Sequence, residues 1–204
     1  MPLDRIIATA IAIVDEQGAD ALSMRTLAHR LDSGTATLYR HFNSRAQLIA
    51  HIVDAVLGEI DLDVAEPSDA SWRDVCEHAA DHMFNVLVRH PNVAPLLLGQ
   101  IPNGPNAAAG RELLIATLLQ AGFSPAIAAQ AYATLSRYVL GFAIQAHQPD
   151  ADAAQYHSQQ LDLESLPATA AVAEHLPVPI AREFAFGLDL ILNGLAQQLD
   201  RPRR

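Results

Sequence analysis

Apolar residues recur at every third or fourth position along most of the chain, which is the pattern of helices that bury one face and expose the other. No segment alternates apolar and polar residues with the period of two that strands require. We therefore expect an all-α protein with about nine to ten helices. At the amino end the pattern predicts a helix over residues 3–17, which Gly18 would end.

Two short helices around a tight turn are predicted next. Ser23 would cap the first helix, because its hydroxyl can accept a hydrogen bond from an unpaired backbone N–H. The turn falls on residues 32–34, Asp-Ser-Gly, which all favour tight or left-handed backbone. The second helix would start near Thr35 and end at His41 or Phe42.

The outward face of this second helix has the chemistry of a helix that enters the major groove of DNA. Arg40 can donate two hydrogen bonds to a guanine edge, Thr37 offers a hydroxyl and a methyl group, and Tyr39 can donate to a phosphate. His41 lies on the same side. The alternative is a surface helix hairpin whose polar face is merely solvated.

The rest of the chain continues the helical pattern. The predicted segments are 44–60, 71–90, 93–98, 107–121, 124–147 and 179–199, with a short helix near Glu174. Residues 101–106 and 148–170 are expected to be loops, and the acidic stretch 61–69 a boundary. The domain organisation that follows is a DNA-binding unit over 1–45, a connecting helix and linker over 46–66, and a larger helical domain over 67–204.

Charge is distributed unevenly along the chain. The whole sequence carries a net charge of −10, which by itself argues against a nucleic-acid partner. Between Ser23 and Arg45, however, four arginines stand against one acid, a net charge of +3. The chain contains no lysine, so phosphate contacts must come from arginine, hydroxyl or backbone groups. The acidic remainder should repel DNA and confine contact to this patch.

The remaining composition points to a cytoplasmic protein without a membrane span. Cys76 is the single cysteine, which excludes an internal disulfide and fits a reducing compartment. The amino end lacks the features of a secretory signal. The most apolar stretch, 126–146, is interrupted by Gln130, Ser136 and Arg137, so it predicts a buried or interface helix.

Enzyme chemistry finds little support in the sequence. There is no nucleophile elbow, glycine-rich phosphate loop or metal motif, so we expect no enzymatic activity and no cofactor. A small helical enzyme and a protein-interaction module that uses the 39–41 face remain the alternatives to a DNA-binding protein. Salt dependence separates them, because binding through several arginine–phosphate contacts weakens steeply with added salt.

Residues 8–52 resemble the DNA-binding domain of the tetracycline-repressor (TetR) family of bacterial regulators. The resemblance lies in the segments ALSMRTLAHRL, TATLYRHF and NSRAQLIAHIV. One departure is Asp32-Ser33, where family members usually have glycine and an apolar residue. The resemblance implies that Arg25 and Arg40 read bases. It further implies groove-lining roles for Thr35, Ala36, Thr37 and His41, and phosphate contacts from Tyr39 and Arg45.

The carboxyl-terminal half resembles the ligand-binding domain of the tetracycline-repressor subgroup. The matching segments are SWRDVCEHAADHMF, LLLGQIP, LLQAGFSP and FAFGLDLILNGLAQQL. The resemblance implies a homodimer whose four-helix interface is formed by the helix starting at Ser124 and the last helix. It also implies that a small molecule inside this domain moves the fourth helix, so that the dimer leaves a palindromic operator.

The effector is expected to differ from tetracycline. Tetracycline sensors of the family hold a drug–magnesium complex with polar residues, and the corresponding positions here are Ala79, Leu97, Gln100 and Ile101. Because three of these are apolar, we expect an apolar or amphipathic effector and no tetracycline–magnesium site. The candidate ligand-binding residues are Ala79, Met83, Leu97, Gln100, Ile101, Leu114, Tyr132 and Ser136, with core packing as the alternative for each.

Two further features have alternative interpretations. His78 and His82 are four apart on one predicted helix and could share a metal, but without a third ligand at a defined spacing we expect solvated surface histidines. Arg137 is expected to pair with an acid across the dimer or to extend towards solvent, in preference to binding an anionic effector. The sequence leaves open the effector, the operator, the regulated genes and the choice between repression and activation.

Overall fold

The computed structural model describes residues 1–62, 71–99, 101–146 and 165–199, and these residues form helices and turns without a strand. The all-α prediction is thereby confirmed for this part of the chain. The elements are α1 (Leu3–Gln17), η1 (Ala19–Ala21), α2 (Met24–Arg30), α3 (Thr35–Tyr39), α4 (Arg45–Leu57), α5 (Trp72–Arg89), η2 (Ala94–Gly99), α6 (Pro105–Gln120), α7 (Pro125–Gln145), α9 (Pro167–Val172), η4 (Ala173–His175) and α10 (Ile180–Leu199).

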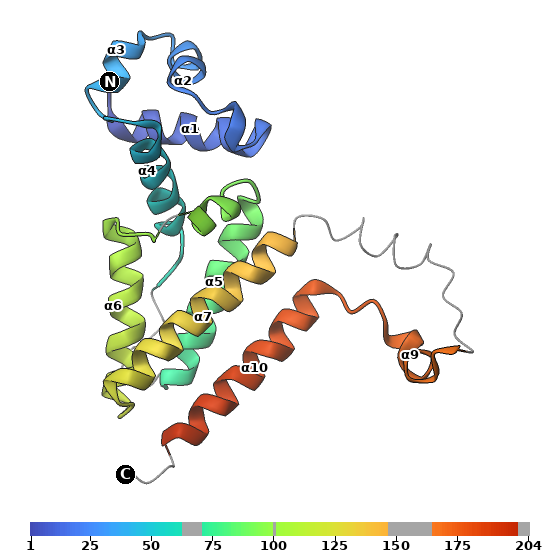
Figure 1. Ribbon diagram of the computed structural model, residues 1–204. Helices are drawn as coiled ribbons and strands as arrows, with labels where there is room; N and C mark the ends of the chain where they lie inside the picture. Colours follow the sequence, from blue (N-terminus) through green and yellow to red (C-terminus); the bar gives the residue numbers. More distant parts are fainter. Residues whose placement is uncertain (63–70, 100, 147–164, 200–204) are drawn as a thin grey trace.

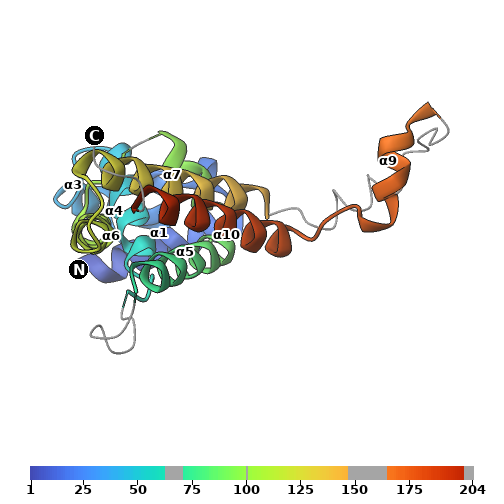
Figure 2. The same ribbon diagram turned by 90° about the horizontal axis from the view of Figure 1, so that it is seen from below.

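The helices form a small amino-terminal unit and a larger bundle (Figure 1). Helices α1, α2 and α3 gather at one end, and α4 runs from them into the bundle of α5, α6, α7 and α10. Helices α7 and α10 lie side by side in both views, whereas α9 lies away from the bundle (Figures 1 and 2). Buried apolar residues from both parts form one continuous cluster.

The amino-terminal unit forms as the local chemistry predicts. Helix α1 ends at Gly18, which adopts a φ of 82°. Ser23 caps α2 in a reciprocal capping box, because its hydroxyl accepts from Thr26 N–H at 3.1 Å and Thr26 Oγ1 accepts from Ser23 N–H at 2.8 Å. The turn then uses Asp32 in the left-handed region, with a φ of 48°.

Helix α3 is shorter than predicted. It ends at Tyr39, and His41 N–H closes a tighter turn on the carbonyl of Leu38 at 2.9 Å. This turn places Phe42 in the core, where its side chain is fully buried and its ring meets that of His51 edge-on. The outer face of this short helix is therefore open to solvent. Leu38 and Phe42, both buried, anchor its inner face to the core.

Two further boundaries differ from the predictions. Helix α6 begins at Pro105 within the predicted loop, because proline at the first helical position needs no N–H partner there. Helix α9 occupies part of the predicted loop 148–170, of which residues 148–164 lie outside the described residues. No helix of the described part is both long and apolar enough to cross a bilayer.

An aromatic cluster joins α10 to the bundle. The ring of Phe184 stacks on Phe84 at 4.3 Å and lies 5.7 Å from Phe142 between centroids. Tyr138 donates a hydrogen bond to the carbonyl of Phe184 at 2.6 Å, and burial raises the pKa of its hydroxyl. A side chain at Gly187 would collide with this hydroxyl, so only glycine allows α7 and α10 to approach so closely.

We predict that Cys76 reacts with thiol reagents only after unfolding. The side chain is 1% exposed, and burial raises the pKa of the thiol to about 12. The thiolate is the reactive species. The raised pKa leaves little thiolate at neutral pH and burial keeps reagents away from it, so both effects slow the reaction. Alkylation at pH 8 should be at least about tenfold slower than in denaturant. Equal rates in the folded and denatured protein would show that α5 opens readily.

Candidate DNA-binding surface and effector cavity

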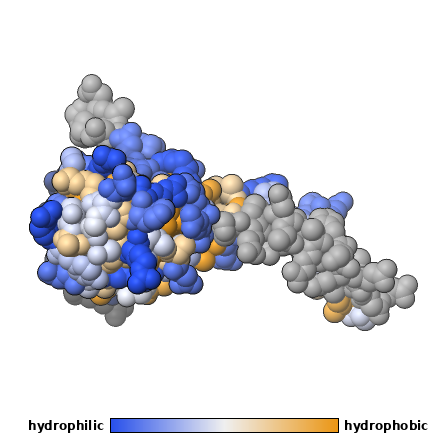
Figure 3. Space-filling model, turned by 90° about the horizontal axis from the view of Figure 1, so that it is seen from above, coloured by the Kyte–Doolittle hydropathy of each residue, from blue (hydrophilic) through white to orange (hydrophobic). Residues whose placement is uncertain are grey.

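The outer face of α3 carries the residues that the sequence assigned to DNA. Tyr39 is 56% exposed, and Arg40 is exposed with its Nη2 atom 3.4 Å from Thr37 Oγ1. Thr35 and Ala36 are exposed, whereas Thr37 and His41 are half-buried. The end of the molecule that carries these helices has a largely hydrophilic surface (Figure 3). The geometry thus leaves Thr35 and Tyr39 accessible on one short helix, with Arg40 accessible directly after it.

The arginines around α2 and α3 differ in their availability. Arg25 is exposed at the start of α2. Arg30 instead makes a two-pronged ion pair with Glu16, with both N–O distances at 2.6 Å. The hydrogen bonds from Arg30 lower the pKa of the Glu16 carboxyl group, and those from Glu16 raise the pKa of the guanidinium. Arg30 therefore contributes less positive charge to this surface than the sequence count suggested.

Arg45 has a structural function that the sequence did not reveal. Its Nε donates to the carbonyl of Leu22 at 2.9 Å, and its Nη2 donates to the carbonyl of Ala19 at 2.5 Å. These bonds tie the first turn of α4 to the segment between α1 and α2. The predicted phosphate contact must therefore use the remaining donors of this guanidinium.

Asp54 joins α4 to the first turn of α6. Its carboxylate, in a side chain only 8% exposed, accepts from Ala107 N–H at 3.0 Å and from Asn106 N–H at 3.4 Å. Asn106 Nδ2 donates back to the Asp54 carbonyl at 3.0 Å. A carboxylate at a helix amino terminus satisfies unpaired donors and complements the helix dipole. A side chain at Gly104 would collide with this carboxylate, so the joint also requires that glycine.

His90 forms a second connection between the two parts of the molecule. Its Nδ1 lies 2.8 Å from Asp15 Oδ2 on α1, and its Nε2 lies 3.2 Å from Glu59 Oε2 just after α4. Asn92 Nδ2 adds a hydrogen bond to the carbonyl of Asp15 at 3.0 Å. The carboxyl end of α5 is thereby tied to α1 and to the segment that follows α4.

A cavity of about 760 Å³ lies between α4, α5, α6 and α7. Seven of the eight residues predicted to contact a ligand line its wall, while Gln100 lies outside the described residues. The seven are Ala79, Met83, Leu97, Ile101, Leu114, Tyr132 and Ser136. Sequence reasoning missed several other wall residues, among them Leu57, Ile60, Asn106, Gly110 and Arg111. The volume is that of pockets for drug-sized ligands.

The wall is apolar apart from a few groups, and its charge is positive. Arg111 and Arg137 are the only charged side chains among the described residues that line it. Arg137 Nη1 donates to the carbonyl of Ala133 at 3.3 Å. Neither guanidinium forms an ion pair within the described part of its own chain, and the expected pairing of Arg137 with an acid across the dimer stays a prediction.

His78 and His82 are not the solvated histidines that the sequence led us to expect. Both are half-buried on α5, and their rings stack with centroids 4.0 Å apart. Asp61, which follows α4, is close to both rings. Spacing along the chain could not indicate this neighbour, because Asp61 lies on a different element.

Together, the exposed α3, the joint between α4 and α6 and the cavity are typical of a ligand-responsive helix-turn-helix regulator. Comparison with known proteins then identifies the family. Residues 6–52 match the family described as bacterial regulatory proteins, tetR family, and residues 64–199 match the tetracyclin repressor-like, C-terminal domain. The chain belongs to the TetR family of transcriptional regulators.

Individual relatives agree with this assignment. A helix-turn-helix transcriptional regulator of Saccharopolyspora erythraea is 38% identical over 138 residues, which cover 68% of this chain and 58% of the relative. The transcriptional repressor DrrR1 of Streptomyces coeruleorubidus is 29% identical, with 96% of this chain and 77% of the relative covered. Apo ActR from Streptomyces coelicolor superimposes with a TM-score of 0.86 at 30% identity, over 98% of this chain and 97% of ActR.

These relatives support the expectations of a DNA-binding regulator and of a protein that is not an enzyme, because they are themselves transcriptional regulators. ActR has also been solved in complex with actinorhodin, with a TM-score of 0.83 at 29% identity over 98% of this chain and 99% of ActR. The chain is therefore a TetR-family transcriptional regulator with a helix-turn-helix domain followed by a ligand-binding domain.

Proposed function

We propose that the protein is a homodimeric repressor that binds a palindromic operator in the bacterial cytoplasm and leaves it when an amphipathic effector enters the cavity. The observation that carries the proposal is the position of α6. This helix supplies cavity residues such as Arg111 and Leu114, and its first turn is held by Asp54 of α4. A ligand that moves α6 therefore acts directly on the helix that carries the DNA-binding unit.

On DNA, α3 would lie in the major groove as the recognition helix. Arg25 and Arg40 would read bases, and Tyr39 and the remaining donors of Arg45 would hold phosphates. The groove-lining residues would be Thr35, Ala36, Thr37 and His41. The exposure of α3 and the internal anchoring of Arg45 support this division of roles, because a recognition helix must be held rigidly to read base edges.

A homodimer is supported by the exposed face of α10. Phe186 is 67% exposed and Leu190 is 55% exposed, and they lie one turn apart on that face. Exposed apolar side chains at helical spacing indicate a surface that is covered in the working protein. The neighbouring α7 exposes small residues such as Ala129 and Gly141, so a partner's helices could approach closely.

The effector would be mainly apolar with an acidic or hydrogen-bond-accepting group. Arg111 and Arg137 place two guanidinium groups in a wall that is otherwise largely aliphatic, and Ser136 and Tyr132 add hydroxyls. No carboxylate or imidazole occurs among the described lining residues, which supports an effector other than a tetracycline–magnesium complex. The complex of ActR with actinorhodin supports a small-molecule ligand for a protein of this fold.

The proposal is tested by a gel-shift titration on an operator selected from random duplexes. Affinity should fall steeply as salt rises from 50 to about 200 mM, because each phosphate contact releases counterions. The same titration separates DNA binding from a protein-interaction module, whose binding would not require a duplex. Failure to enrich any palindromic sequence would contradict the proposal.

We predict that Arg40→Ala weakens specific operator binding by about 1–3 kcal/mol, because an arginine that reads a base edge contributes that much. The matched control is Arg111→Ala, which removes a guanidinium from the cavity wall and leaves the α3 surface intact. Arg111→Ala should bind the operator normally and respond to effector more weakly. Loss of operator affinity in both variants alike would indicate a general charge effect and contradict the role of Arg40.

A further inference from the structure

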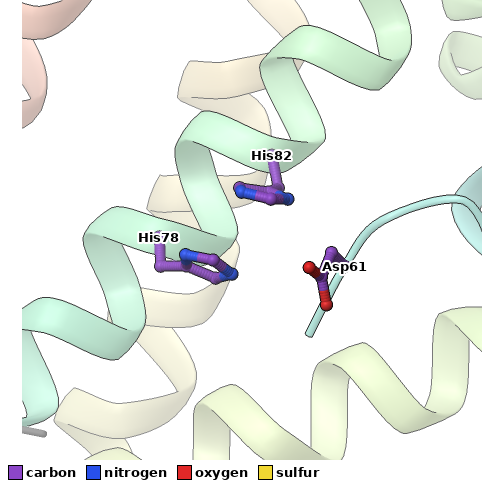
Figure 4. Close-up of side chains that lie close together, drawn as sticks. All are labelled: Asp61, His78 and His82. Carbon is purple, nitrogen blue, oxygen red and sulfur yellow. The ribbon is translucent and has the colours of Figure 1, made fainter. Parts of the chain in front are cut away.

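Three potential metal ligands from two segments meet beside the cavity. Asp61 follows α4, and His78 and His82 lie one turn apart on α5 with their side chains directed towards it (Figure 4). One ligand atom from each of the three residues lies within 4.8 Å of the other two. The cluster is separate from the described cavity wall, which contains none of these residues.

The surroundings of His78 point to a missing partner. Its Nε2 atom is buried and has no hydrogen-bond partner among the described residues. A buried polar atom without a partner is costly, and such atoms are uncommon in folded proteins. His82 holds the ring of His78 in place by stacking. The arrangement therefore orients an imidazole nitrogen towards a place where, among the described residues, Asp61 and His82 offer further donor atoms.

We propose that Asp61, His78 and His82 form a binding site for a divalent transition-metal ion of the Zn²⁺ type, with water as the fourth ligand. Two imidazoles and a carboxylate form a donor set that suits zinc and the neighbouring first-row ions. Tetrahedral bonds of about 2.0–2.2 Å bring the ligand atoms to roughly 3.4 Å from one another. The ligand atoms of the three residues now lie within 4.8 Å of one another, and small rotations of the side chains would bring them to the distance that the ion requires.

The ion would tie the end of α4 to α5. Asp61 is flanked by Ile60 and Leu62, and both of these residues line the cavity. On the other side, His78 and His82 each precede a cavity residue, Ala79 and Met83. The metal would thus fix the relative position of two cavity walls. The inference does not depend on the identity of the effector or on DNA binding, because metal binding is measured on the free protein.

The site is tested with Co²⁺ as a spectroscopic probe and Zn²⁺ as its competitor, on the full-length protein after treatment with a chelator. The wild-type protein should bind one Co²⁺ per chain, with the visible absorption of a four-coordinate ion that Zn²⁺ abolishes. Zn²⁺ should also raise the melting temperature, because a ligand that binds only the folded state stabilises it.

Single substitutions at the three positions identify the ligands. His78→Ala, His82→Ala and Asp61→Asn should each weaken Co²⁺ binding at least about tenfold, whereas His29→Ala, which removes an exposed histidine on α2, should bind as the wild type does. His82→Cys supplies a thiolate at the same place and should restore binding, with an added sulfur-to-cobalt band.

Two controls separate loss of a ligand from unfolding. Helix content and melting temperature are compared without metal for every variant, and His82→Cys changes the same position but should still bind the ion. Folded ligand variants that bind Co²⁺ as tightly as the wild type would overturn the proposal. A wild-type spectrum of a six-coordinate, water-like ion that Zn²⁺ does not displace would overturn it equally.

Discussion

Replacing both Phe186 and Leu190 with aspartate should convert the protein into a monomer and lower its affinity for a palindromic operator by about 100-fold or more. The two side chains form the most exposed apolar pair on α10, and four carboxylates facing one another across a two-fold interface would repel. A monomer engages one half-site at a time, so it loses the gain in affinity that linking two binding units provides. Sedimentation velocity and gel shift measure the two effects.

Leu119→Asp is the matched control, because Leu119 is a 42% exposed leucine on α6 and does not belong to the exposed face of α10. This variant should remain a dimer in sedimentation velocity and should bind the operator with unchanged affinity. The buried side of α10, with Phe184 and Leu188 in the core, is untouched in the double variant, so helix content should be kept. A double variant that remains dimeric would place the interface elsewhere.

The helix starts were predictable because their chemistry is local. Ser23 was expected to cap a helix, and three more predicted segments began at Ser44, Ser71 and Ser124. Each of these four hydroxyls accepts a hydrogen bond from the backbone N–H three residues later. All the atoms of such a cap lie within one turn, so a short stretch of sequence contains the whole interaction. The left-handed backbone at Asp32 was predictable for the same reason, because it depends on residues within one turn.

The cavity was only partly predictable. Met83 and Leu87 lie on one face of α5 at helical spacing, but Leu87 is fully buried in the core and Met83 lines the cavity. Periodicity cannot separate the two, because both positions point inward. The resemblance to a family with a known pocket position selected Met83 and its neighbours, and it missed Arg111, which no family motif marked.

The long-range connections between helices were not predictable from a single sequence. Arg45 reaches Leu22 across 23 positions, Asp54 reaches Ala107 across 53, and His90 reaches Asp15 across 75. Each contact depends on how whole helices pack, and nothing in the local sequence of either partner indicates the other. The same limit applied to Asp61, whose closeness to His78 and His82 became visible only in three dimensions.

Asp54→Ala should lower the free energy of unfolding by about 2–4 kcal/mol, because it leaves the N–H groups of Asn106 and Ala107 without their acceptor and removes a carboxylate from a helix amino terminus. The loss is larger than for a surface acid because the side chain is only 8% exposed, so little water replaces it. Asp54→Asn keeps the size and one acceptor oxygen, so it should lose less. Denaturant unfolding monitored by circular dichroism gives both values.

The matched control is Glu112→Ala, which removes an exposed carboxylate from the same helix, α6, and should change stability by less than about 0.5 kcal/mol. The second readout is the effector response. Since Asp54 is the hydrogen-bonded joint between α6 and α4, its loss should leave effector binding in the cavity while reducing the effect of that binding on operator affinity. If Asp54→Ala is destabilised as expected but releases DNA at the wild-type effector concentration, α4 is moved through another contact, and the connection through His90 becomes the next to remove.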